Sequence, residues 1–577
     1  MTESVVNTFP NQDDIHLCDV LIAGGGPIGL SLACELGRRG VSCIVIDEKD
    51  GFHSHPRATF LGPRTMEYFR MWGIDQQVLL HALPVDYPPD VVFTETMAGA
   101  EIGRLSYPTI NQMAHRTAES LEKYPQLAWS RFAKVVIGQN MLEPLLFEAS
   151  ESYPNVQNKK GTRLLSFQQR EDHVQAFVEC KSGSMEIKAQ FLVGCDGGRS
   201  LVRKGLGATF DGLGEIGRSV NTYFDCPDLL KAIGKQPAAI SWSLRPGATG
   251  AILAIDGLRK WVFSRYLLPG ETFSESDDPS SSILAALGVK VELTVISSWY
   301  WTPRQLVSNS YGSGRVYLAG DSAHLMSPTG GYGLNTGIAD VMNVGWRIAA
   351  VLKGWAPVEL LDSYELERRP MALRAAKEAT DNRAFTRVVL ETGGLLESMT
   401  SREHAFDFIR KTMSRHGKHF DGNGIYLGDR YDQSPIVFDD GSPPTPWDAE
   451  IYFPTTRPGG RLPLAWLDEH TTLHDVCGRD FTLFTQNAEA VHALQETFAS
   501  FRVPLKVFEL QGRCKNICQQ NLIVRPDGIV AWRSADDFEP DEVVMRITAL
   551  RAFQKRAAIP GVVQQLKEIY RDNQAST

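Results

Sequence analysis

The hydrophobic pattern opens with an apolar run at residues 20–23, which predicts a short buried strand. Apolar residues then recur at helical spacing over residues 30–39, and a second apolar run follows at residues 41–46. The hexapeptide GGGPIG, from Gly24 to Gly29, separates the first run from the helix. The pattern therefore predicts a strand, a tight turn, a helix and a second strand that ends in Asp47.

This glycine-rich turn is suited to hold the pyrophosphate of a dinucleotide. Gly24 permits the turn, Gly26 lets the backbone approach the phosphates, and Gly29 allows the helix to pack closely on the strand. The free N–H groups at the start of the helix face the ligand. Asp47 follows at about the 20-residue spacing at which a carboxylate reaches a ribose hydroxyl. The sequence therefore predicts a dinucleotide site here.

A second stretch, residues 212–217, also fits the glycine pattern. Asp211 precedes it in place of an apolar strand, and a strand-like run at residues 219–224 follows it in place of a helix. Because the nucleotide fingerprint needs strand, turn and helix in that order, we interpret the second match as a loop.

The remaining pattern predicts three further parts. Short strand-like runs at residues 239–244, 251–255 and 261–267 indicate an antiparallel sheet inserted between parts of the nucleotide domain. That domain resumes at residues 315–321, continues into long helices at residues 337–353 and 360–387, and is followed by a small α/β domain. The expected boundaries are 15–90, 121–210 and 300–400 for a Rossmann-like nucleotide domain, 91–120 and 211–299 for the inserted β domain, 401–463 for a linker and 464–577 for the C-terminal domain.

Composition excludes several classes of function. The chain has 577 residues, of which 43% are hydrophobic and 22% charged, as in ordinary soluble globular proteins. A net charge of −9 offers no basic surface for nucleic acid or an anionic membrane. No apolar stretch reaches about 18 residues and the N-terminus lacks a signal-peptide pattern, so we expect a cytoplasmic protein. The nine cysteines are scattered and predict free thiols, and no metal-ligand pattern stands out.

A second informative stretch starts at Gly320-Asp321 and runs to residue 336. A strand that ends in Gly-Asp places a carboxylate where the ribityl hydroxyls of a flavin can donate to it. The glycines that follow bring bare backbone against a flat ring. A helix expected to begin near Thr336 would present N–H groups to the ring edge that becomes anionic on reduction. This stretch therefore indicates a flavin.

Five features then occur in one order along the chain: the glycine motif with Asp47, Pro56-Arg57-Ala58, Gln139, a segment from Cys195-Asp196-Gly197 to Arg203, and Gly320-Asp321. In that order they resemble the fingerprints of the flavin-dependent aromatic hydroxylases, single-component FAD monooxygenases that include p-hydroxybenzoate hydroxylase and phenol hydroxylase. The resemblance covers about residues 15–400. The tail resembles the thioredoxin-like C-terminal domain of the longer members, although it lacks their relatives' redox cysteine pair.

The resemblance implies an FAD- and NAD(P)H-dependent monooxygenase that hydroxylates a phenolic or polycyclic aromatic substrate through a flavin C4a-hydroperoxide. NADPH, or NADH, would be a transient reductant, O2 the co-substrate, and a homodimer the expected assembly. The glycines of the first motif would hold the pyrophosphate, Asp47 the adenosine ribose and Asp321 the ribityl chain. The implied cofactor-binding residues are Gly24, Gly26, Pro27, Ile28, Gly29, Asp47, Glu48, Arg57, Gln139, Asp196, Gly320, Asp321, Pro328, Gly331, Gly333, Leu334 and Asn335.

The resemblance does not identify a catalytic base. Some phenol-hydroxylating relatives have His or Asp directly after Pro-Arg-Ala, whereas this chain has Thr59, which cannot act as a base near neutral pH. The other candidates for contact with the substrate are Tyr223, Trp242, Arg245, Tyr266 and Pro328, although aromatic residues in a sheet are often core residues. Two other functions stay open: Baeyer–Villiger-type or epoxidising oxygenation on the same fold, and flavin binding without catalysis.

Overall fold

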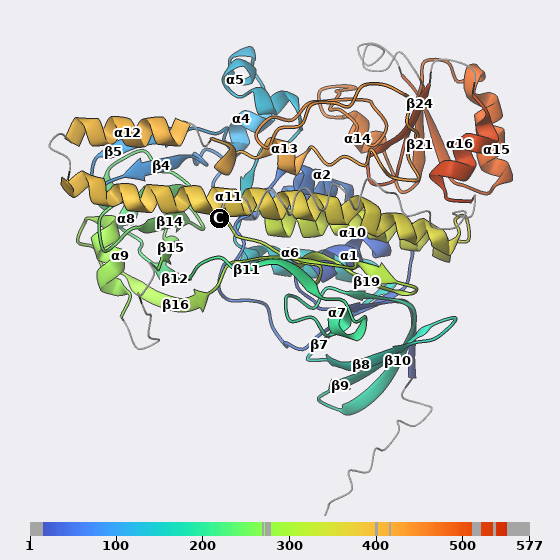
Figure 1. Cartoon of the computed structure of the whole chain (residues 1–577), viewed down its shortest axis with the longest axis horizontal. Helices are drawn as coiled ribbons and strands as arrows, with labels where there is room; N and C mark the ends of the chain where they lie inside the picture. The colour runs from blue at the N-terminus through green and yellow to red at the C-terminus, as the bar shows by residue number, and fades with distance from the viewer. Residues whose placement is uncertain are drawn as a thin grey trace, which may run out of the picture.

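The chain folds around two large sheets, with the C-terminal domain packed at one end (Figure 1). The computed structural model describes residues 15–267, 271, 278–398, 402–414, 417–510, 521–534 and 538–550. In Figure 1 the smaller β domain lies at the left, the nucleotide domain in the centre and the C-terminal domain at the upper right.

The nucleotide domain is built on a sheet in the order β18-β19-β10-β1-β2-β7, to which β9 and β8 are added beside β10. Strands β19, β10, β1, β2 and β7 pair in parallel. Buried apolar residues fill β1 and β2, as the sequence predicts. The bounds are β1 (Ile15–Ala23), β2 (Cys43–Asp47), β7 (Val156–Lys160), β8 (Arg163–Gln169), β9 (Val174–Cys180), β10 (Gly183–Gly194), β18 (Gly312–Ser313) and β19 (Val316–Leu318).

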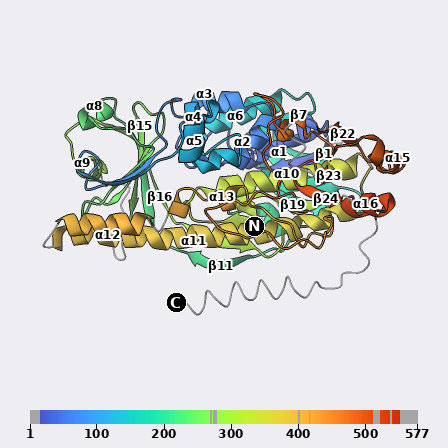
Figure 2. The same ribbon diagram turned by 90° about the horizontal axis from the view of Figure 1, so that it is seen from above.

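Helices cover this sheet and extend beyond it. Helix α1 (Pro27–Arg38) packs between α6 (Gln139–Glu151) and α10 (Tyr332–Leu352). Helix α11 (Asp362–Ser398) runs from the C-terminal domain to the smaller β domain, and α12 (Arg402–Ser414) continues along the same side (Figure 2). The shorter helices are α2 (Pro63–Met71), α3 (Asp75–His81), α4 (Ile110–Ala114), α5 (Ala118–Lys123) and α7 (Leu201–Gly205).

The second sheet, hereafter called the substrate sheet after the role that the sequence predicts for it, has seven strands in the order β16-β12-β15-β14-β13-β4-β5. Helices α8 (Leu229–Ile233) and α9 (Ser280–Leu287) cover one face, and α11 and α12 pack against the other. Its β4 and β13 pair in parallel, so the sheet is mixed and not purely antiparallel as predicted. The bounds are β4 (Val91–Thr94), β5 (Glu101–Leu105), β12 (Ser219–Asp225), β13 (Ile240–Ser243), β14 (Gly250–Ala254), β15 (Lys260–Tyr266) and β16 (Thr294–Trp301).

A two-stranded and a three-stranded sheet are the other small sheets of the described chain before the C-terminal domain. Strand β3 (Phe60–Leu61) pairs with β6 (Val135–Val136), and β17 (Arg304–Ser308) pairs with both β11 (Phe210–Glu215) and β20 (His324–Leu325). The first four residues of the second glycine match therefore lie in a strand and not in the predicted loop, and only Ile216 and Gly217 follow it. Gly212 is needed there because a Cβ would lie 2.2 Å from the Gln305 carbonyl oxygen.

The stretch predicted as a linker, residues 401–463, contains α12 and α13 (Asn423–Tyr426), and it is therefore more than a surface connection. Ile409 and Met413 of α12 are buried against the substrate sheet. The prolines and glycines further along the stretch suggested a linker and gave no sign of this packing.

The C-terminal domain has a four-stranded sheet in the order β22-β21-β23-β24, with one parallel and two antiparallel pairs. With α15 between the parallel strands and α16 after β24, this is the predicted thioredoxin-like arrangement. The bounds are α14 (Leu473–Val476), β21 (Phe481–Thr485), α15 (His492–Ser500), β22 (Leu505–Glu509), β23 (Asn521–Val524), β24 (Val530–Ser534) and α16 (Pro540–Ile547).

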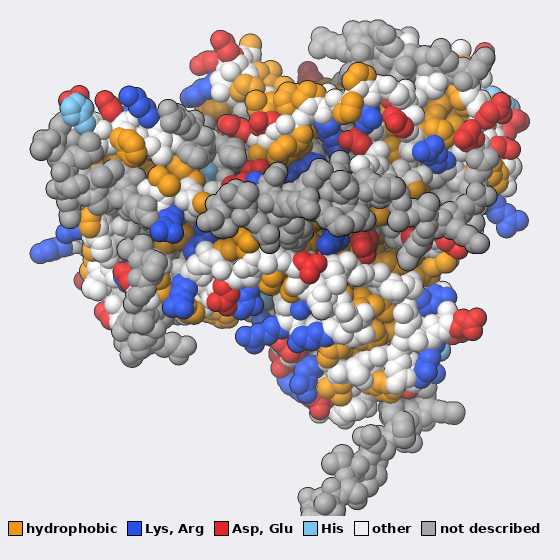
Figure 3. Space-filling view, in the orientation of Figure 1, with side chains coloured by type: hydrophobic (Ala, Val, Ile, Leu, Met, Phe, Trp, Pro, Cys, Tyr) orange, Lys and Arg blue, Asp and Glu red, His pale blue; other side chains and the backbone are white. Residues whose placement is uncertain are grey.

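The surface carries mixed charge. On the face in Figure 3, basic and acidic side chains of the described residues are interspersed and form no single large patch. No helix in the described part of the chain is long and apolar enough to cross a membrane. The described cysteines are free thiols, whereas Cys514 and Cys518 lie outside the described residues.

Candidate active site

The predicted nucleotide turn connects β1 directly to α1. Gly24 has φ +107°, and a Cβ on it would lie 2.3 Å from the Cys195 carbonyl oxygen. A Cβ on Gly29 would lie 1.9 Å from the Gly24 carbonyl oxygen, so only glycine fits at either position. A Cβ on Gly26 would meet no atom within 4 Å. The turn thus has an open face at Gly26, above the first N–H groups of α1, with Pro27 in its first turn.

Asp47 lies at the end of β2, beside the turn. Its Oδ2 accepts a hydrogen bond from Gly25 N at 2.7 Å, and its Oδ1 accepts one from Lys49 N at 2.8 Å. Each carboxylate oxygen keeps a second lone pair for a ribose hydroxyl. Glu48 next to it is exposed.

Asp321 follows β19 in a short turn that Gly320 enters at φ +66°. The residue is exposed, although nearby protein atoms displace part of the water around its carboxylate. This desolvation raises the pKa of Asp321, while His324 and Arg57 oppose the shift. None of the described residues donates a hydrogen bond to this carboxylate, so its acceptor sites are available to a ligand.

Helix α10 begins at Tyr332, four residues before the predicted start near Thr336. Gly330 and Gly331 have φ of +95° and +71°, whereas Gly333 is already helical, so only two of the three glycines belong to the loop. The Asn335 side chain accepts from Gly62 N at 2.7 Å and donates to the Phe60 carbonyl at 3.1 Å. The start of α10 is thereby fixed to β3.

Arg57 and Gln139 approach the same region from the loop after β2 and from α6. Burial lowers the pKa of Arg57, and the charges of Glu143 and Asp321 oppose this. Glu143 was not predicted, yet it accepts from Gln139 Nε2 at 2.7 Å and from His53 N at 2.9 Å. Its spacing of four residues from Gln139 on one helix is a signal that could have identified it.

Asp196 has a structural role in addition to any role toward a ligand. Its Oδ2 accepts from Leu201 N at 2.7 Å and Val202 N at 3.1 Å, so it caps α7. Its Oδ1 is buried and has no partner among the described residues. Arg203 donates to the carbonyls of Ser322 and Gly198, which connects this segment to the turn at Asp321.

Three of the predicted substrate contacts lie on one face of the substrate sheet. Tyr223, Trp242 and Tyr266 alternate with residues that pack on α8 and α9, and they therefore face the other way. His55, two residues before Arg57, lies on the same side. Its Nδ1 is 2.8 Å from Ser297 Oγ, and its ring lies 6.0 Å from that of Tyr223. This face is therefore turned toward the loop that carries Arg57.

Trp242 is enclosed by other rings. It stacks on Phe93 and Tyr266 at centroid distances of 6.0 and 5.7 Å, so both faces of its indole are occupied. Arg245 lies in the exposed turn between β13 and β14. Thr59 is buried just before β3, and Pro328 is exposed just before the two loop glycines.

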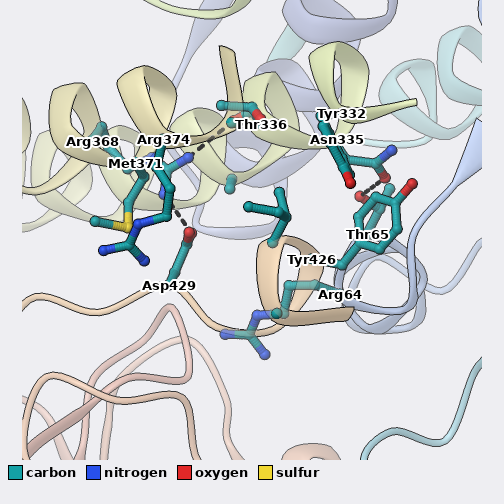
Figure 4. Close-up of a pocket in the computed structure, with 14 residues that line it drawn as sticks. Arg64, Thr65, Tyr332, Asn335, Thr336, Arg368, Met371, Arg374, Tyr426 and Asp429 are labelled. Carbon is teal, nitrogen blue, oxygen red and sulfur yellow. Dashed lines mark hydrogen bonds and ion pairs between the residues drawn. The ribbon is translucent and has the colours of Figure 1, made fainter. Parts of the chain in front are cut away.

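The cavity shown in Figure 4 lies between α10, α11 and α13. Tyr332, Asn335 and Thr336 line it from α10. Gly337, on about the opposite side of that helix, packs on Ile28 of the nucleotide turn. Its volume of about 30 Å³ suits one or two water molecules and not an aromatic ring. We therefore do not assign the substrate to it.

Comparison with known proteins identifies the family. Residues 17–379 match the family described as "FAD binding domain", and residues 455–553 match "Aromatic-ring hydroxylase, C-terminal". The chain belongs to the flavin-dependent aromatic hydroxylases. It is 30% identical over 577 residues to phenol 2-monooxygenase of a Pseudomonas species, with 91% of each chain covered.

Solved structures of this hydroxylase family extend the likeness to the whole fold. The rebeccamycin biosynthetic enzyme RebC, soaked with chromopyrrolic acid and holding 7-carboxy-K252c, superposes with a TM-score of 0.83 at 31% identity. That match covers 92% of this chain and 99% of RebC. A ternary complex of aklavinone-11 hydroxylase with FAD and aklavinone has a TM-score of 0.76 at 27% identity, over 92% and 99% of the two chains.

The residues of this hydroxylase fit FAD. The open face at Gly26, the unpartnered carboxylate of Asp321 and the N–H groups at the start of α10 are three separate places that would suit phosphate, ribityl and ring. A buried network that the sequence did not predict supports the turn at Asp321, the place suited to the ribityl chain. Asp340 accepts from Gly320 N at 3.2 Å and from Arg368 Nε at 2.8 Å, and contacts His324 Nε2 at 2.9 Å.

Removing the Asp321 carboxylate is expected to weaken FAD binding with little effect on folding. Asp321→Ala should yield folded protein with less than about a tenth of the wild-type flavin content, since a charge-assisted hydrogen bond contributes roughly 1.5–3 kcal/mol. Flavin absorbance per protein after purification measures this, with circular dichroism as the check on folding. A normal flavin content would show that Asp321 does not hold the ribityl chain.

Proposed function

We propose that this flavoprotein hydroxylates a phenolic or polycyclic aromatic substrate, with NAD(P)H as reductant and O2 as oxidant. The observation that carries the proposal is the aromatic face of the substrate sheet, which is turned toward the loop of His55 and Arg57. A flat substrate between that face and the start of α10 would lie against the flavin ring. The names of the relatives, phenol 2-monooxygenase and aklavinone-11 hydroxylase, support an aromatic substrate.

In this proposal bound FAD would supply the group that NAD(P)H reduces and that then activates O2. The protein supplies position and electrostatics. The N–H groups at the start of α10 would stabilise negative charge at the ring edge, and Asp321 would orient the ribityl chain. Buried aromatic residues such as Tyr223 and Trp242 keep water from the reacting ring. The Thr59 hydroxyl can donate a hydrogen bond to the substrate but cannot remove its proton.

Oxygen insertion into a ketone is the second candidate. Thr59 favours it, because such a reaction needs no base to ionise a phenol.

One experiment separates these functions. The purified yellow protein is given NADPH and, in turn, a panel of phenols, polycyclic phenols and cyclic ketones in labelled O2. We expect a phenol to accelerate NADPH oxidation and to gain one labelled oxygen on a ring carbon. A labelled ester or lactone from a ketone would favour the second candidate. Flavin that NADPH never bleaches would instead indicate a protein that binds FAD without catalysis.

A further inference from the structure

Lys134 is a charged residue within an otherwise apolar stretch, residues 132–137, directly before β6. Its ammonium lies 4.8 Å from the Phe60 ring centroid and 5.4 Å from the Tyr107 ring centroid. It donates a hydrogen bond to the Phe420 carbonyl. A lysine placed this deep loses most of its hydration, and one carbonyl and two ring faces replace it only in part.

Phe60 places Lys134 beside the loop expected to line the flavin. A Cβ on Gly331 would lie 3.1 Å from Phe60 Cβ, and the Phe60 carbonyl accepts from Asn335 Nδ2. Tyr426 donates to the Gly330 carbonyl from the same side. A single ring therefore separates the ammonium from the start of α10.

On its other side, Lys134 borders the aromatic face of the substrate sheet. Phe60, Tyr107 and Phe420 pack in one apolar cluster with Trp242 and Tyr266. The ammonium thus contacts two rings of the aromatic cluster that covers this part of the face.

Asp421 lies close enough to act on Lys134 without forming an ion pair within the described residues. Burial lowers the pKa of Lys134 to about 8, and Asp421 opposes this. Burial likewise raises the pKa of Asp421 to about 6, with Lys134 and the hydrogen bond from Asn423 opposing and Glu450 adding to the shift. Tyr107 and Tyr426 also face Asp421, and burial keeps the pKa of both phenols well above the ordinary value. Lys134 and Asp421 thus have pKa values about one unit above and about one unit below neutral pH.

We propose that Lys134 is the base that ionises the substrate phenol, and that its ammonium then holds the phenolate; this rests on the proposed hydroxylase function. The O–H bond of the substrate breaks, its electron pair stays on oxygen, and the proton forms a new bond to Nζ of the neutral amine. After oxygen transfer, the proton returns to the product oxygen. Lys134 thereby does what Thr59 cannot do.

The recognised substrate class follows from this geometry. In this proposal a hydroxyl on the edge of a planar ring system reaches Lys134 while the rings lie beside Tyr223, because Phe93 and Tyr266 already cover both faces of the Trp242 indole. This selects aromatic alcohols acidic enough to share a proton with an amine, such as phenols conjugated to a carbonyl group.

Binding of alizarin, a planar hydroxyanthraquinone whose anion absorbs at longer wavelength, tests the base directly. With the wild-type holoenzyme we expect the anion spectrum at a pH at least one unit below that needed in buffer. Lys134→Met, which keeps the length and removes the amine, should lose this shift. Lys123→Met is the matched control, because Lys123 also lies over a ring, 5.2 Å from that of Tyr124, but is exposed on α5. No shift with wild type, or the same shift with Lys134→Met, would overturn the proposal.

Turnover separates this proposal from the proposed function. With any phenol that wild type hydroxylates, Lys134→Met should lower kcat/KM at least 100-fold and remove the rise of kcat with pH. Wild-type kcat/KM in that variant would reject Lys134 as the base and leave the hydroxylase function intact. If the wild type hydroxylates no phenol but still shifts the alizarin spectrum, the function fails while the binding of a phenolate by Lys134 stands.

Discussion

Replacing Gly26 by valine is expected to give a folded protein that holds no FAD. A Cβ at this position meets no protein atom within 4 Å, so the side chain costs the apoprotein little. The same open face is where the pyrophosphate would approach the backbone, and a branched side chain would fill it. We expect an affinity for FAD at least 100-fold lower, measured by flavin fluorescence on titration of the apoprotein, with an unchanged circular dichroism spectrum.

Gly478→Val is the matched control for this variant. Gly478 also has open space around its Cα and lies in the C-terminal domain, so a valine there should leave flavin content unchanged. A yellow, active Gly26→Val protein would mean that the pyrophosphate lies elsewhere.

Glu367→Ala is expected to destabilise the protein by about 3–5 kcal/mol. The carboxylate lies on α11 and is 1% exposed. It accepts from Arg347 Nη2 at 2.6 Å and from Arg525 Nη1 and Nη2 at 2.6 and 2.8 Å. Alanine would leave both guanidinium groups buried beside each other without their shared anion. Urea unfolding followed by tryptophan fluorescence measures the loss.

Acid should reduce this difference. The two arginines hold the pKa of Glu367 far below its usual range. Its contribution is therefore complete above the pKa of an unfolded glutamate, about 4.3, and declines as pH falls below that value. Asp381→Ala, which breaks an exposed pair with Lys377, is the control and should cost at most about 1 kcal/mol. Equal losses for the two variants would contradict a dominant role of burial.

Features that depend on neighbours in sequence were predictable. The φ of +107° at Gly24 and the close approach of Gly29 to the Gly24 carbonyl are local backbone needs of this turn, and the strand, turn and helix lie where the glycines put them. In the C-terminal domain, the predicted strands at residues 481–485 and 505–509 match β21 and β22. Short apolar runs between turn residues carry that information within a few positions.

Features that depend on distant neighbours were not predictable. Strand β7 is polar at most positions and is a strand because β2 pairs with it. The start of α10 was misplaced because Gly333 is helical, and Asn335 fixes that start through contacts more than 270 residues away. The sequence shows Lys134 as a lone charge in an apolar run. It does not show that the rings of Phe60 and Tyr107, which lie elsewhere in the chain, contact this charge.

Helix α10 also has a consequence for swapping parts between relatives. It extends about 30 Å, from the glycine loop at Tyr332 to the C-terminal domain. At that far end Trp346 stacks on Trp355 and meets the edge of Phe481, and its indole N–H donates to Asp527 at 3.3 Å. A chimaera that carries another enzyme's C-terminal domain must therefore bring ring and carboxylate partners for Trp346, or the graft will disturb the helix whose opposite end is proposed to border the flavin.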